Sequence, residues 1–119
     1  MNREPSVLLA AALACLLISL PSFAAYGSVA EARLASGKII SADFRQGSSG
    51  KPAVLVLHGF LQTSAFPTVA SMVDALSAAG YTVLAPTLSL GISRRNESLP
   101  CEALHLHTLD DDAAEVAFW

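Results

Sequence analysis

The sequence predicts an α/β fold, and three observations support this prediction. Residues 54–57 form a continuous apolar run between turn residues, which is typical of a strand covered on both faces. Residues 67–80 carry apolar side chains at helical spacing, and residues 81–85 form a second apolar run that Pro86 is expected to end. A strand, a helix and a strand in this order indicate a crossover between two parallel strands.

A β-hairpin is expected ahead of this unit. Residues 40–45 alternate between apolar and polar side chains, which is the pattern of a strand with one buried face. The apolar face consists of Ile40, Ala42 and Phe44. The turn residues Ser36 and Gly37 precede this strand, so residues 29–35 are expected to be its hairpin partner.

Two helices are predicted, and both have recognisable ends. Pro67 suits the first turn of the first helix, and Gly80 suits its C-terminal end. The apolar stripe of this helix consists of Val69, Met72, Val73 and Leu76. The second helix is expected over residues 110–119, with Thr108 as its N-cap and aspartates at its positive end. Its expected apolar stripe consists of Leu109, Ala113, Val116 and Ala117.

The N-terminus has the features of a secretory signal peptide. Residues 7–20 form an apolar run that follows Arg3, and small residues precede an expected cleavage site after Ala24. The run is shorter than the roughly 20 residues that a membrane-spanning helix needs. We therefore expect residues 1–24 to be removed and the mature chain to be exported, either to a periplasm or to the medium. Lipid attachment at Cys15 is the alternative.

Composition narrows the range of functions. The chain is 53% hydrophobic and 14% charged, with a net charge of −3, which is too apolar for a disordered chain. It has no basic stripe for a phosphate backbone, so nucleic acid is not an expected partner. A membrane is expected as a partner only through the signal peptide before cleavage. Removal of that peptide would leave Cys101 as the single cysteine, either unpaired or bonded to a cysteine outside this chain.

The residues that follow the two predicted parallel strands carry a motif. The first strand runs into Leu57-His58-Gly59-Phe60, and the second ends at Ala85-Pro86, with Gly91-Ile92-Ser93 further on. In this order and context, residues 29–119 resemble the N-terminal part of an α/β-hydrolase. The implied fold is an incomplete portion of that sheet, with a β-hairpin followed by a strand, a helix and a strand. In this family the third strand lies between the fourth and the fifth.

The loop after the fourth strand departs from the family pattern at two positions. Many members read Pro-Asp-x-x-Gly-x-Gly-x-Ser there, whereas this chain has Thr87 in place of the aspartate and Ser89 in place of the first glycine. The resemblance therefore rests mainly on the segment from Leu57 to Phe60 and on its place between a strand and a helix.

The resemblance implies a role for the His58 loop. In this family a serine attacks an acyl carbonyl, and backbone N–H groups stabilise the negative charge that develops on its oxygen. The implied donor from this loop is the N–H of Phe60, with the N–H of Leu61 as second choice. Gly59 is expected to allow the sharp turn and close approach to substrate that such a donor requires. The ring of His58 is expected to hold the loop by hydrogen bonds.

The nucleophile of such an enzyme is not found in this sequence. It would sit in Gly-x-Ser-x-Gly, and no such motif occurs among the 119 residues. We therefore expect residues 25–119 to be a partial hydrolase domain that is inactive alone, within an exported serine hydrolase that acts on small acyl compounds such as esters. No cofactor is expected. The alternative is a non-catalytic exported binding module on the same scaffold.

Two polar groups outside the motif have competing interpretations. Cys101, His105 and His107 contain metal-binding side chains, but their spacing places only two of them on one face of a helix, so no metal site is expected. Arg94, Arg95 and Glu97 are expected to form a solvated loop, or otherwise a rim for an acidic substrate.

Overall fold

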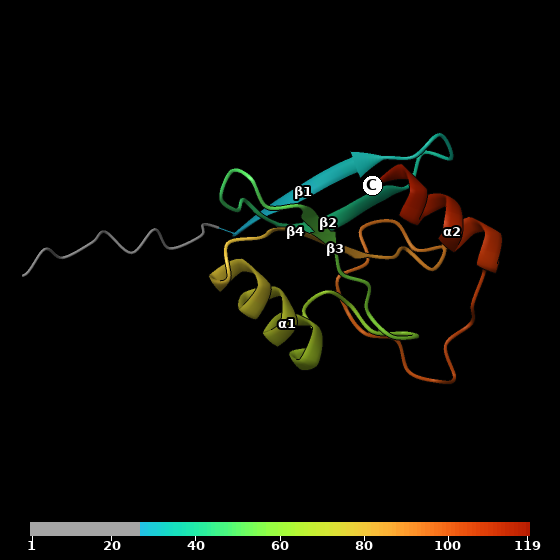
Figure 1. Cartoon of the computed structure of the whole chain (residues 1–119). Coiled ribbons are helices and arrows are strands. Elements are labelled where there is room, and N and C mark those ends of the chain that lie inside the picture. The colour runs from blue at the N-terminus through green and yellow to red at the C-terminus, as the bar shows by residue number, and fades with distance from the viewer. Residues whose placement is uncertain (1–26) are drawn as a thin grey trace, which may run out of the picture.

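A computed structural model describes residues 27–119 of the chain (Figure 1). The expected signal peptide, including its cleavage site after Ala24 and the alternative lipid site at Cys15, lies outside the described residues. Within residues 27–119, no helix has both the length and the apolar character needed to cross a membrane.

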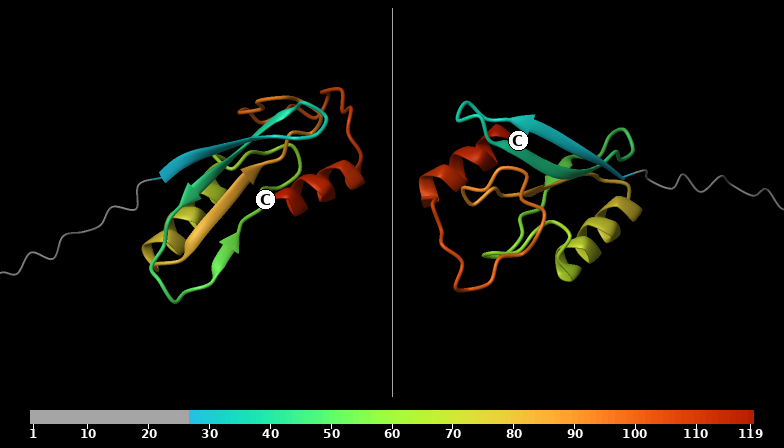
Figure 2. Two further views of the ribbon diagram at one scale, coloured as in Figure 1. Left: turned by 90° about the horizontal axis from the view of Figure 1, so that it is seen from above. Right: turned by 180° about the vertical axis from the view of Figure 1, so that it is seen from behind.

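The described residues form a mixed α/β fold with one sheet of four strands. The strands are β1 (Gly27–Arg33), β2 (Ile39–Arg45), β3 (Ala53–Leu55) and β4 (Thr82–Thr87), in the spatial order β1-β2-β4-β3. The pairs β1–β2 and β2–β4 are antiparallel, whereas β3 and β4 are parallel. Helix α1 (Pro67–Ala78) connects β3 to β4, and α2 (Leu109–Phe118) lies at the C-terminal end, well away from α1 (Figures 1 and 2).

The predicted hairpin is confirmed. Ala30 pairs with Ala42 in the middle of the antiparallel ladder, and Gly37 occupies the left-handed conformation at the turn. Ile40 and Ala42 are buried, as the alternating pattern predicts. The polar face of β2 carries a bidentate pair between Arg45 and Asp43, and Arg45 also approaches Asp74 of α1.

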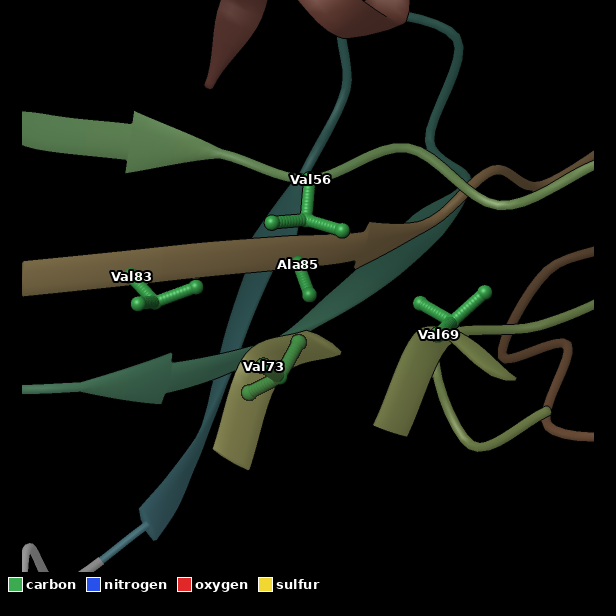
Figure 3. Close-up of a cluster of buried hydrophobic side chains, with 5 residues drawn as sticks. All are labelled: Val56, Val69, Val73, Val83 and Ala85. Atoms are coloured by element: carbon green, nitrogen blue, oxygen red, sulfur yellow. The ribbon is translucent and has the colours of Figure 1, made fainter. Parts of the chain in front are cut away.

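Helix α1 packs its buried side chains against the two parallel strands. Val69 and Val73 point from the helix toward the sheet, where Val56, Val83 and Ala85 complete the core cluster (Figure 3). The helix begins at Pro67 as predicted, and Gly80 takes a left-handed conformation just after its end. Met72, in contrast, is 56% exposed, so its predicted place in the apolar stripe is wrong. Val69 and Val73 lie one turn apart on the face of α1 that contacts the sheet. Met72 lies to the side of this face and does not pack against the sheet core.

Strand β3 differs from the expectation that it is covered on both faces. Val54 and Val56 pack into the core beside α1, but Leu55 and Leu57 point the other way and are exposed. Within residues 27–119, only β4 pairs with β3, so β3 forms one edge of the described sheet. Residues 27–119 therefore cover only one face of this apolar strand.

Strand β4 extends through Pro86, so the prediction that this proline ends the strand is wrong. Pro86 is buried and lies opposite Ala42 of β2. The ladder between β3 and β4 ends near Leu84, where Val56 donates its N–H to the carbonyl of Leu84. A proline beyond that point does not interrupt pairing with β3, which is why the strand tolerates it.

The cap of α2 is confirmed, whereas its predicted apolar stripe is wrong. The side chain of Thr108 accepts from the N–H of Asp111, and the Asp111 carboxylate accepts from the N–H of Thr108 in a capping box. Leu109 and most of the stripe are nevertheless exposed. The buried residue of the helix is Glu115, at 3% exposure, which accepts from the N–H of Ser89 at 2.8 Å. This charged hydrogen bond orients the helix.

Substitution of neighbouring residues in α1 tests the packing. Val73 is 1% exposed, so Val73→Ala is expected to lower the free energy of unfolding by about 2 kcal/mol through lost burial and a residual cavity. Met72→Ala is the matched control and is expected to change it by less than about 0.5 kcal/mol. Urea unfolding of the two variants measures the difference. Equal losses would contradict the orientation of α1.

Candidate functional site

The segments that follow β3 and β4 lie together at one edge of the sheet. Because β3 and β4 are parallel, their carboxyl ends point the same way, and the loops leaving them meet there. Residues 58–62 follow β3, and residues 88–97 follow β4. We call the first the His58 loop and the second the Arg95 loop. Hydrogen bonds between the two loops define the candidate site.

Both ring nitrogens of His58 are hydrogen-bonded, and Nε2 connects the two loops. Its Nε2 lies 3.0 Å from the backbone nitrogen of Leu88, which is a donor, so Nε2 accepts this hydrogen bond. Its Nδ1 lies 2.7 Å from the carbonyl oxygen of Gly59, which can only accept, so Nδ1 carries the proton. The two contacts require the neutral imidazole with its proton on Nδ1.

Arg95 is the second connection, and its position corrects the prediction of a solvated loop. The residue is only 5% exposed. Its Nε donates to the carbonyl of Leu88 at 2.7 Å, and its Nη1 donates to the carbonyl of Glu97 at 2.8 Å. Its Nη2 donates to the carbonyl of Gln62 at 2.7 Å and lies 3.3 Å from Nε2 of His58. Arg95 therefore holds both loops at once.

Burial shifts the pKa values of both side chains in the same direction. Desolvation is the main cause that lowers the pKa of His58, and the nearby Arg95 charge lowers it further, against the opposing effects of the Gly59 carbonyl and Asp112. Desolvation also lowers the pKa of Arg95, with Glu115 and Asp112 opposing that change. An arginine remains charged even so. The site therefore pairs a permanent cation with a neutral imidazole.

The turn within the His58 loop does not use Gly59 in the expected way. Gly59 is not in the left-handed region; Leu61 is, with a φ of 63°. A Cβ on Gly59 would lie 2.9 Å from Oε1 of Gln62, which accepts from the N–H of Gly59 at 3.2 Å. The glycine therefore makes room for the Gln62 side chain. The N–H of Gln62 donates to the Gly59 carbonyl and closes the turn.

The two expected oxyanion donors lie in the middle of this turn. Within residues 27–119, the N–H groups of Phe60 and Leu61 have no hydrogen-bond acceptor. The Phe60 side chain is largely exposed and lies against the ring of His105, with 5.6 Å between the ring centroids. The Leu61 side chain is buried, and its carbonyl accepts from the N–H of Leu99. The backbone between the two side chains is thus anchored and retains free donors.

A hollow of about 490 Å³ lies on the α1 side of the sheet. The polar side chains in its wall include Asp43, Arg45, Thr63, Thr87 and Arg95. Neither Phe60 nor Leu61 lines it. A group bound in this hollow would therefore not lie against those N–H groups.

Sequence reasoning missed the roles of two buried polar residues near the two loops. Glu115 accepts from Ser89, as described above, and Thr87 accepts from the N–H of Ser64 at 3.0 Å. The Thr87 hydroxyl thereby joins β4 to the segment before α1. Neither role has a local pattern in the sequence, because each partner comes from a distant segment.

The cysteine and histidine residues near the C-terminus make other contacts. Cys101 is exposed and unpaired among the described residues, and Nδ1 of His107 lies 2.9 Å from Asp112 Oδ1. The His105 ring lies between those of Phe60 and His107. In the part of the chain that the structure describes, no three His, Cys, Asp or Glu side chains are grouped to hold a metal ion.

No protein-family model matches the chain, and no curated protein is significantly similar to it in sequence. The interpretation of the site therefore depends on its residues and their geometry.

Replacing Arg95 tests its role as the connection between the loops. Arg95→Met is expected to lower the free energy of unfolding by about 3 kcal/mol, because carbonyl groups of both loops lose a charged donor in a buried position. Arg94→Asn is the matched control, since Arg94 is exposed and asparagine tolerates its φ of 57°. Chemical denaturation measures both. A loss below about 1 kcal/mol for Arg95→Met would contradict this role.

Proposed function

We propose that residues 25–119 are the N-terminal part of an exported serine hydrolase of the α/β-hydrolase type, and that they supply one side of its oxyanion hole. The observation that carries this proposal is the pair of unbonded N–H groups at Phe60 and Leu61, in a loop fixed at the carboxyl end of a parallel strand. The expected substrates are small esters or related acyl compounds, and no cofactor is required.

The order of the strands supports the proposal. In α/β-hydrolases the third strand lies beside the fourth, and the strand that carries the nucleophile lies on its other side. Here β3 lies beside β4, and within residues 27–119 its outer edge has no partner. The exposed side chains of Leu55 and Leu57 are consistent with a strand that further segments of a larger domain would cover.

The chemistry assigned to this chain is electrostatic. When a serine from elsewhere in the protein attacks an acyl carbonyl, the π electrons of the carbonyl move onto its oxygen. The N–H of Phe60 or Leu61 would donate to that oxyanion, and a fixed loop avoids reorganisation at the moment of reaction. His58 and Arg95 would hold this loop and would not touch the substrate.

A pair of substitutions at Phe60 tests this role in the protein that contains this chain and its nucleophile. Phe60→Pro removes the backbone N–H, whereas Phe60→Ala retains it and trims a side chain that is already exposed. We expect Phe60→Pro to lower kcat at least about 100-fold with little change in KM, and Phe60→Ala to leave kcat nearly unchanged. Hydrolysis of a chromogenic short-chain ester provides both constants.

The result also separates the two functions considered for this scaffold. Equal kcat values for the two variants, with their folds intact by circular dichroism, would remove the Phe60 N–H as an oxyanion donor. Failure of the exported protein to react with a fluorophosphonate, which labels activated serines, would favour a non-catalytic binding module.

Export is a separate part of the proposal. We expect the mature protein to begin at Ala25, because Ser22 and Ala24 are small residues at the positions that a signal peptidase reads. Mass spectrometry of the N-terminal peptide from the exported fraction identifies the cleavage site. A retained Met1, or a lipid on Cys15, would refute cleavage after Ala24.

A further inference from the structure

The ring of His58 receives two donors at one nitrogen. The N–H of Leu88 points to Nε2 from 3.0 Å, and Nη2 of Arg95 lies 3.3 Å from the same atom. The other ring nitrogen, Nδ1, faces the carbonyl oxygen of Gly59 at 2.7 Å. A second proton on this ring can only enter at Nε2, because Nδ1 already holds one. This proton would then point at the N–H of Leu88 and at Nη2 of Arg95, the two donors that face Nε2 of the neutral ring.

We propose that His58 and Arg95 form a clasp that is closed only while His58 is neutral, so that acid releases the His58 loop from the Arg95 loop. Protonation removes the acceptor of Leu88 and places a positive imidazolium beside a buried guanidinium. Both effects oppose the closed arrangement. The proposal concerns how the two loops are joined, and it holds whether or not Phe60 binds an oxyanion.

The charged groups around His58 determine how strongly acid acts. Arg95 contacts the His58 ring, and its positive charge disfavours the protonated form of His58. Asp112 of α2 and the Gly59 carbonyl favour the protonated form. The charge of Glu115 in α2 acts on Arg95 instead, where it opposes the lowering of the arginine's pKa. The Asp112 carboxylate also accepts a hydrogen bond from Nδ1 of His107 at 2.9 Å. Burial and the Arg95 charge act in the direction that keeps His58 neutral.

The direction of the pH effect follows from the pKa of His58 in the two states. The pKa is lowered in the closed clasp and is near its ordinary value of about 6.5 when the loop is open. The contribution of the clasp to stability is therefore complete above about pH 6.5, and it decreases as the pH falls toward the lowered pKa. The ratio of closed to open loops falls by up to about tenfold for each pH unit that separates the two pKa values.

Nuclear magnetic resonance of the full chain tests the clasp without any substitution. At neutral pH, two-bond nitrogen–proton spectra should show His58 as the tautomer with its proton on Nδ1. As the pH is lowered, the amide of Leu88 should lose protection from hydrogen exchange, after correction for the intrinsic pH dependence, together with protonation of His58. The proton on Nε2 at neutral pH, or a Leu88 amide whose corrected protection does not change with pH, would overturn the proposal.

One variant and its controls distinguish His58 from the other two histidines. The side-chain oxygen of glutamine can take the place of Nε2 as an acceptor but cannot be protonated in this range, so His58→Gln is expected to keep Leu88 protected down to about pH 5. His105→Gln and His107→Gln should retain the acid sensitivity of the parent chain. Acid sensitivity that persists in His58→Gln, or disappears in His105→Gln or His107→Gln, would assign the effect to another group and refute the clasp.

Discussion

The buried guanidinium of Arg95 is the group on which the arrangement of the two loops depends. A charge that is 5% exposed is stable only if its donors are satisfied, and here they bond to carbonyl groups of Leu88, Glu97 and Gln62. Those carbonyls come from both loops, so the charge is satisfied only while the loops are together. Among the described residues, no carboxylate is within salt-bridge distance of Arg95. Backbone carbonyl groups therefore solvate the Arg95 cation, and these hydrogen bonds hold the two loops together.

The bonds between the two loops continue the pairing of β3 with β4. The ladder between β3 and β4 ends where Val56 bonds to Leu84, and the next connection along the same line is the bond from Leu88 to His58. Arg95 then bonds to Gln62 beyond it. Side chains thus replace the backbone ladder once the two strands diverge. A three-residue strand at a sheet edge would otherwise leave the following loop weakly held.

The features predicted correctly from sequence are those with local causes. Pro67, Gly80 and Thr108 mark helix ends because their backbone or side-chain chemistry acts within one turn. Periodicity predicts a stripe of apolar residues but not the neighbour that the stripe faces, which is why the predictions for Met72 and Leu109 are wrong. Burial of Arg95 could not be predicted, because its partners at Gln62 and Leu88 become neighbours only after β3 and β4 pair. The sequence therefore points to the His58 loop but not to the Arg95 loop that holds it.

The free N–H groups of the His58 loop follow from how the loop is anchored. On one side of Phe60, His58 and the Gly59 carbonyl are bonded; on the other, Gln62 uses its N–H, its carbonyl and its side-chain amide. The backbone between them turns through Leu61 in a left-handed conformation, which costs roughly 1–3 kcal/mol for such a residue. Burial of the Leu61 side chain and the bond from Leu99 to its carbonyl offset that strain. The anchors hold a strained turn without using its own donors, so a ligand oxygen could be bound there without rearrangement of the backbone.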